Sequence, residues 1–279
     1  MNDTSPGSRR PVASGRALTG DPSGRLSLAR RYNALLGGKD NQAVDRRSAH
    51  ALAEVFPGAV AAAIENRRFL RRAVAALAKA GVSQFLDVGC GLPHEPTVHE
   101  VARQVVPGAR VVYVDNDPLV LAYARALMHS PGATGHILAD LDDPETILDH
   151  PQLGVLDLAQ PVALLAVGVL HFLPVPYPAL ARLRDALAPG SYMAVTHHSH
   201  DHLPADVAER LTALTGPGGG HGPLYPRTRA DVVRLLDGDG WEVLAPGVVP
   251  VRRWQPRRYP EPDPDGPQTA LYAGVAHRP

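Results

Sequence analysis

The sequence predicts an α/β protein with a doubly wound, mostly parallel sheet of seven strands. Short apolar segments alternate with helical segments between residues 82 and 196, which is typical of parallel strands covered by helices on both faces. The first apolar segment ends in a turn containing Gly89 and Gly91, and the second ends in the acidic residue Asp115. Because open sheets of this kind bind nucleotide-like ligands at the carboxyl ends of their strands, these two features indicate a ligand site.

The N-terminal part of the chain is expected to precede the sheet. Residues 1–25 are rich in glycine, proline, serine and arginine, so they cannot bury enough apolar surface to fold and are predicted to form a disordered tail. Residues 26–80 are predicted to form a helical cap, and residues 81–279 are predicted to form the ligand-binding domain. Within the cap, the pattern of apolar residues predicts helices over 28–36, 42–55 and 58–80.

The rest of the chain is predicted to alternate between strands and helices. The final helix is predicted to begin after Thr228, whose side chain suits an N-cap. The predicted strands cover 82–88, 110–114, 134–139, 161–167, 191–196, 241–251 and 269–277. The predicted helices cover 97–106, 118–128, 144–149, 178–187 and 228–241. Crossovers between the parallel strands are expected to be right-handed.

Composition limits the classes of function. The chain has 279 residues, of which 44% are hydrophobic, and a formal net charge of +0. That length supports a sizeable core, and the balanced charge argues against a general electrostatic attraction to nucleic acid. Cys90 is the one cysteine, which suits a reducing cytoplasm, and no apolar segment approaches membrane-spanning length. We expect a cytoplasmic protein without a membrane partner; its sequence carries no signal for an oligomeric state.

The glycine turn and the acid after the second strand form the candidate ligand site. Gly89 and Gly91 lack a Cβ, so the chain can turn sharply there and a ligand can approach the backbone closely. Asp115 can accept hydrogen bonds from both hydroxyls of a ribose. A dinucleotide site would need a third glycine where this chain has His94, so the pattern favours another nucleotide-like ligand over NAD.

Several segments together resemble a known family. In order, they read YNALLGGKDN at 32–41, NRRFLRRAV at 66–74, FLDVGCGLP at 85–93, YVDNDPLVL at 113–121, HILADLDDP at 136–144, LHFLP at 170–174 and PGVVPVRRWQP at 246–256. The chain resembles the class I S-adenosylmethionine-dependent methyltransferases, and within them the S-adenosyl methyltransferase family of high-GC bacteria. The resemblance implies S-adenosylmethionine as cofactor, methyl transfer to a small-molecule acceptor, and a Rossmann-like sheet that ends in an antiparallel hairpin.

The resemblance also implies roles for individual residues. Asp140 would accept a hydrogen bond from the adenine amino group, although an N-cap role for the following helix is the alternative. Asp87 would orient the glycine turn, and Tyr32 and Lys39 would lie on a lid over the cofactor. The residues expected to hold the cofactor are Asp87, Gly89, Gly91, Asp115, Asn116, Asp140, Leu141, Gly168, Lys39 and Arg67.

The candidate catalytic residues are His171, His197 and Tyr32. A neutral histidine can remove a proton near pH 7, but methyl transfer depends mainly on alignment of the reacting atoms. The histidine-rich segment THHSHDH at 196–202 could hold a metal, yet adjacent histidines on an extended chain point to opposite sides, so no metal site is predicted. Two alternatives stay open, namely non-catalytic binding of S-adenosylmethionine or S-adenosylhomocysteine and an NAD-binding oxidoreductase.

Overall fold

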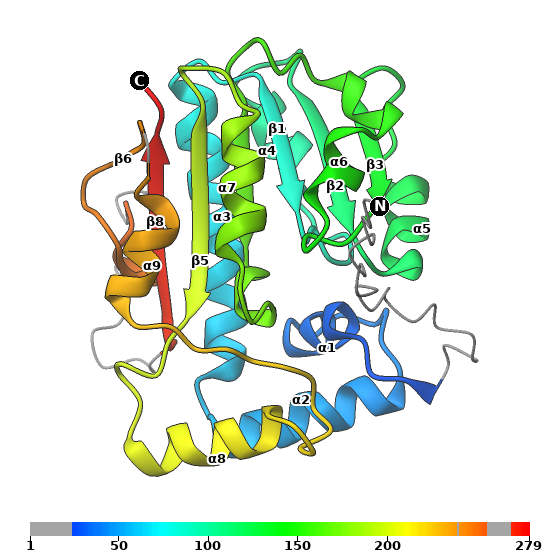
Figure 1. Ribbon diagram of the computed structural model, residues 1–279. Helices are drawn as coiled ribbons and strands as arrows, with labels where there is room; N and C mark the ends of the chain where they lie inside the picture. The colour runs from blue at the N-terminus through cyan, green and yellow to red at the C-terminus, as the bar shows by residue number, and fades with distance from the viewer. Residues whose placement is uncertain (1–23, 239, 256–268) are drawn as a thin grey trace, which may run out of the picture.

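The computed structural model describes residues 24–238, 240–255 and 269–279. The predicted tail at 1–25 lies outside the described residues except for its last two positions. A mixed sheet runs through the molecule with the strand order β3-β2-β1-β4-β5-β8-β6, and β7 also pairs with β8 (Figure 1). Its strands are β1 Gln84–Val88, β2 Arg110–Asp115, β3 Thr134–Leu138, β4 Ala163–Val167, β5 Tyr192–His198, β6 Glu242–Val243, β7 Val249–Pro250 and β8 Leu271–His277.

The first five strands are parallel, and β8 runs antiparallel to β5. The predicted doubly wound, mostly parallel sheet is therefore confirmed. The continuous strand predicted over 241–251 is wrong, because the chain forms two short strands there, β6 and β7, which both pair with β8. Pro246 has no N–H to donate to a neighbouring strand, and Gly247 has a positive φ of 85°. The chain therefore turns between β6 and β7 instead of continuing as one strand.

Helices cover both faces of the sheet. Side chains that alternate along each strand therefore point into two separate cores. Phe85 and Tyr113 face the core formed with α3, α4 and α5, whereas Leu86 and Val112 face the core formed with α6, α7 and α9. This two-sided burial explains the nearly continuous apolar segments in the sequence. The helices are α1 Leu28–Leu35, α2 Ala43–Val55, α3 Ala59–Lys79, α4 Val98–Arg103, α5 Pro118–Leu127, α6 Pro144–Leu148, α7 Tyr177–Asp185, α8 Ala205–Thr215 and α9 Arg229–Leu236.

Three helices lie across the carboxyl edge of the parallel strands. Figure 1 shows α1 and α2, in blue, and α8, in yellow, below the ends of the strands, while α3 runs along the sheet. We refer to α1 and α2 as the N-terminal cap. The sequence predicts α1 and α2 but not α8. The division of the chain into a cap and a domain at residue 80 stays a prediction. The helix α3 ends just before that position and packs against β4, β5 and β8.

A buried ion pair holds the two cap helices together. Arg30 on α1 donates from Nε to Oδ2 of Asp45 on α2 over 2.7 Å, and the Asp45 side chain is 0% exposed. Asp45 also accepts hydrogen bonds from the backbone N–H groups of Ser27 and Gln42. The Ser27 hydroxyl donates to Asp117 at the start of α5, which fixes the beginning of α1 against the sheet.

Candidate functional site

The glycine turn after β1 has a conformation that only glycine adopts easily. Gly89 and Gly91 have φ values of 71° and 65°. A Cβ added to Gly89 would collide with the side chain of Val169, whereas a Cβ added to Gly91 would point into open space. The turn therefore presents bare backbone to a space that a ligand can enter.

Asp115 lies beside this turn at the end of β2. Its Oδ2 accepts a hydrogen bond from the Gly91 N–H over 2.9 Å, and its Oδ1 accepts one from the Asp117 N–H over 3.0 Å. Asp115 is 9% exposed, so most of the residue is buried and a small part of its surface stays accessible. Because each carboxylate oxygen can accept more than one hydrogen bond, Asp115 retains acceptor capacity for a ligand.

Asn116 and Asp140 link the ends of β2 and β3. The Asn116 amide donates from Nδ2 to Oδ2 of Asp140 over 3.0 Å, and Asp140 is exposed. The N-cap residue of α6 is Asp143, so Asp140 does not cap that helix. Leu141 is buried directly after it. The structure thus brings Gly91, Asp115, Asn116 and Asp140 to one edge of the sheet, where parallel strands end.

Two charged residues support the same turn from α3 and β1. Asp87 is buried on β1, and burial is the main cause that raises its pKa to about 7; the Arg67 guanidinium opposes this rise and the Asp115 carboxylate adds to it. Arg67 donates from Nη2 to the His94 carbonyl oxygen over 3.1 Å. Lys39 lies exposed in the loop after α1, and no hydrogen bond joins its side chain to other described residues. Arg67 therefore lies beside the turn, and a role for Lys39 at the cofactor stays a prediction.

The raised pKa of Asp87 predicts a pH-dependent contribution to stability. The folded protein holds this proton to about pH 7, whereas an unfolded aspartate releases it near pH 3.8, so the contribution of Asp87 is fully present below pH 3.8 and is lost as the pH rises through 7. We expect Asp87→Asn to gain stability relative to the wild type as the pH increases across this interval. Urea unfolding of both proteins across the range measures the difference, and parallel pH profiles would contradict the assignment.

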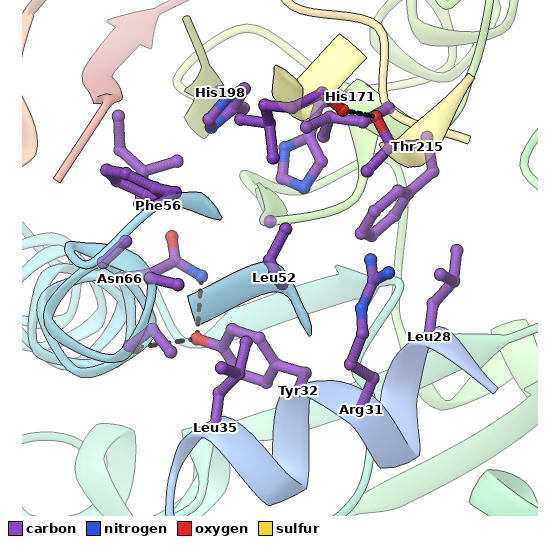
Figure 2. A pocket seen from close by; sticks show the side chains of 18 residues that line it. Leu28, Arg31, Tyr32, Leu35, Leu52, Phe56, Asn66, His171, His198 and Thr215 are labelled. Atoms are coloured by element: carbon purple, nitrogen blue, oxygen red, sulfur yellow. Dashed lines mark hydrogen bonds between the residues drawn. The ribbon is translucent and has the colours of Figure 1, made fainter. Parts of the chain in front are cut away.

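A pocket opens between the cap and the carboxyl ends of β4 and β5 (Figure 2). Gly168, at the end of β4, lies on its wall with a φ of 78°, and a Cβ there would come within 2.7 Å of Nδ2 of Asn66. The pocket has a volume of about 100 Å³, and its walls are mostly apolar. Its lining comes from segments far apart in the sequence, including Leu28, Arg31, Tyr32, Leu52, Phe56, His171, Phe172, His198, Leu211, Thr215 and Leu224.

Two buried histidines contribute ring nitrogens that have no hydrogen-bond partner among the described residues, Nδ1 of His171 and Nε2 of His198. His171 is 8% exposed and lies in the short 3₁₀ helix η3 (Leu170–Phe172), and His198 is 6% exposed at the end of β5. Burial keeps the pKa of His171 well below its usual value and lowers the pKa of His198 to about 3. Both imidazoles are therefore neutral near pH 7, and both residues line the pocket.

The other two candidate bases have their polar atoms engaged elsewhere. The Tyr32 hydroxyl donates to the Ala63 carbonyl oxygen and accepts a hydrogen bond from Nδ2 of Asn66, and burial raises its pKa. His197 points to the opposite side of β5 from His198, as adjacent strand residues do, and its Nε2 contacts the Arg227 guanidinium over 2.9 Å. His197 therefore does not line the pocket, and Tyr32 lines it with its hydroxyl already bonded.

His198 belongs to the histidine-rich segment 196–202 but is not among the predicted site residues, and neither are Arg31 and Phe56. Alternation along β5 could have identified His198, because it lies two residues after the buried Thr196 on the same side of the strand. No group of three or more histidine, cysteine, aspartate or glutamate residues in the described ranges is arranged to hold a metal ion. None of the helices in the described part of the chain combines the length and hydrophobicity that a membrane crossing requires.

Comparison with known proteins agrees with this geometry. The profile of a family described as S-adenosyl methyltransferase matches residues 21–279. A protein from Thermobifida fusca YX, provisionally assigned as a methyltransferase, is 41% identical, with 91% of this chain and 95% of that chain covered and a TM-score of 0.82. A DUF574 family protein from Streptomyces avermitilis MA-4680 is 36% identical, with 92% and 99% covered and a TM-score of 0.82.

A more distant structure shares the fold. The trans-methyltransferase CalH, solved in complex with S-adenosylhomocysteine, is 16% identical, with 79% of this chain and 59% of that chain covered and a TM-score of 0.51. The curated proteins include no significant match to this chain.

Proposed function

This chain belongs to the S-adenosyl methyltransferase family, and from that premise we propose that it methylates a small-molecule acceptor held in the pocket between the cap and η3. Its cofactor is S-adenosylmethionine. The family assignment replaces the alternative of an NAD-binding oxidoreductase. Non-catalytic binding of the cofactor is the alternative that an experiment has to exclude.

The residues at the sheet edge fit this cofactor. Gly91 leaves open space beside a buried carboxylate, Asp115, that retains acceptor capacity for ribose hydroxyls. Asp140 lies exposed one strand further along, where an adenine amino group would meet it. Arg67, behind the turn, supplies a positive charge for a carboxylate. We assign Asp115 to the ribose, Asp140 and Leu141 to the adenine, and Arg67 with Gly168 to the amino-acid part.

The observation that carries the proposal is the position of the pocket. Gly168 belongs to its wall and also follows β4 at the same sheet edge as the glycine turn, so a bound acceptor would lie next to the cofactor site. When bound, S-adenosylmethionine supplies an electrophilic methyl group, and the acceptor nucleophile takes it while the sulfur keeps the electron pair. The pocket walls exclude water and hold the acceptor in line, which is the main requirement of this reaction.

His171 is the residue best placed to contact the acceptor. It lines the pocket, whereas His197 does not, and the Tyr32 hydroxyl is already hydrogen-bonded. The strongly lowered pKa of His171 makes it a weak base, so we propose that it orients a polar acceptor atom by a hydrogen bond. A proton leaving the acceptor can pass to the His171 imidazole only as the reaction proceeds, when the acceptor becomes more acidic.

Calorimetry followed by a labelling assay tests the proposal. The purified protein is expected to bind S-adenosylmethionine and S-adenosylhomocysteine but not NAD. It is then incubated with methyl-labelled S-adenosylmethionine and an extract of Streptomyces avermitilis, and the products are separated by size. Label in the low-mass fraction supports small-molecule methylation. Label only in the macromolecular fraction would refute the acceptor class, and binding without any transfer would support the non-catalytic alternative.

A further inference from the structure

The pocket contains a buried cation that methyl transfer itself does not require. Arg31 lies on α1, is 5% exposed and lines the pocket. Figure 2 shows its side chain rising from α1 toward His171. Burial lowers the pKa of Arg31 to about 10, and Asp45 only partly opposes this effect, so the guanidinium still carries its charge at pH 7.

This charge has little compensation from the protein. Among the described residues, no carboxylate forms an ion pair with Arg31, and the one hydrogen bond of its side chain runs from Nη1 to the His221 carbonyl oxygen. Asp45, the nearest acid, already accepts hydrogen bonds from Arg30, Ser27 and Gln42. A guanidinium has five N–H donors, and a buried charge without a counter-charge is unfavourable. The pocket is therefore electrostatically suited to an anion.

The remaining walls define the rest of the ligand. Phe56, Phe172 and several leucines and alanines make most of the surface apolar, so a hydrophilic ligand such as a sugar phosphate would leave polar groups unpaired. His171 and His198 line the pocket as neutral imidazoles, so we expect the ligand to present one polar group to them. The volume of about 100 Å³ is below the 150 Å³ of a cavity that holds benzene, which limits the ligand to a small body.

We propose that the acceptor is a small organic acid with an apolar body, whose anionic group pairs with Arg31 and whose polar group faces His171 and His198. The inference rests on the proposed function, because it identifies the pocket ligand as the methyl acceptor. It makes Arg31 a specificity-determining residue. The anion could alternatively be the carboxylate of the cofactor, since that group is also a small anion at this sheet edge, and the test separates these sources.

Calorimetry with matched probes tests the inference in the presence of saturating S-adenosylhomocysteine. The probes are 3-hydroxybutyrate and 3-hydroxy-3-methylbutyrate, each compared with its own neutral amide. We expect at least one acid to bind about 10- to 100-fold more tightly than its amide, since hydrogen bonds to charged groups are the stronger ones. We expect Arg31→Gln to abolish this preference and Arg31→Lys to retain part of it. Arg47→Gln, which removes an exposed arginine on α2, is the matched control.

A second titration identifies the source of the anion. S-adenosylhomocysteine carries the amino-acid carboxylate, and 5′-methylthioadenosine lacks it. Unchanged affinity of Arg31→Gln for both compounds supports the proposal, whereas a loss confined to S-adenosylhomocysteine would assign Arg31 to the cofactor and overturn it. Equal binding of acids and amides, or no binding of either, would also overturn it. Failure of the wild type to bind S-adenosylhomocysteine would refute the proposed function itself.

Discussion

Replacement of Asp115 by alanine is expected to weaken the binding of S-adenosylhomocysteine by about 10- to 100-fold. The substitution removes the carboxylate that accepts the Gly91 N–H and the Asp117 N–H, and with it the acceptors assigned to the ribose hydroxyls. The loss therefore combines missing ligand contacts with a less ordered glycine turn. Isothermal titration calorimetry of the purified variant measures the change in affinity.

Two further variants separate these contributions. Asp115→Asn keeps one acceptor oxygen and is expected to fall between the wild type and the alanine variant. Asp149→Ala removes an exposed carboxylate at the end of α6 and is the matched control for a lost negative charge. Circular dichroism establishes that each variant is folded. A folded Asp115→Ala protein with wild-type affinity would show that the ribose is held elsewhere.

The sheet edge could be predicted from the sequence because its signals are local. Each of Asp87, Asp115 and Asp140 belongs to the end of an apolar strand or follows it directly, and parallel strands bring such ends to one edge. The contact between Asn116 and Asp140 follows from the same arrangement, since β2 and β3 are neighbours. The fold class needed only the alternation of strands and helices.

The pocket could not be predicted in this way, because its walls come together only through tertiary packing. Arg31 on α1 and Phe56 after α2 meet His198 on β5, and no sequence period relates them. His198 also required the true end of β5, which extends past the predicted residue 196 because His198 pairs with Leu271 on β8. The helix α8 was not predicted from the sequence; its buried residues are Leu211 and Thr215.

Disruption of the ion pair inside the cap is expected to have the largest effect on stability. Asp45→Asn removes the negative charge that pairs with Arg30. Arg30 is only 4% exposed, and within the described ranges it forms no other ion pair. Removing one partner of a buried pair costs about 3–5 kcal/mol, because the remaining charge is uncompensated. Urea unfolding, monitored by circular dichroism, measures the free energy of unfolding of the variant and the wild type.

An exposed pair provides the matched comparison. Nε of Arg182 lies 2.5 Å from Oε1 of Glu145, but the two side chains are 45% and 51% exposed. Arg182→Ala is therefore expected to lower the free energy of unfolding by less than about 1 kcal/mol.

Amide hydrogen exchange then identifies which part of the Asp45→Asn variant is destabilised. Faster exchange confined to α1 and α2, with a global transition like that of the wild type, would mean that the cap opens separately from the sheet. A lowered global transition would mean that they unfold together, because Ser27 and Asp117 join α1 to α5. In either case α1 carries Arg31 and Tyr32, so a loosened cap is also expected to expose the pocket.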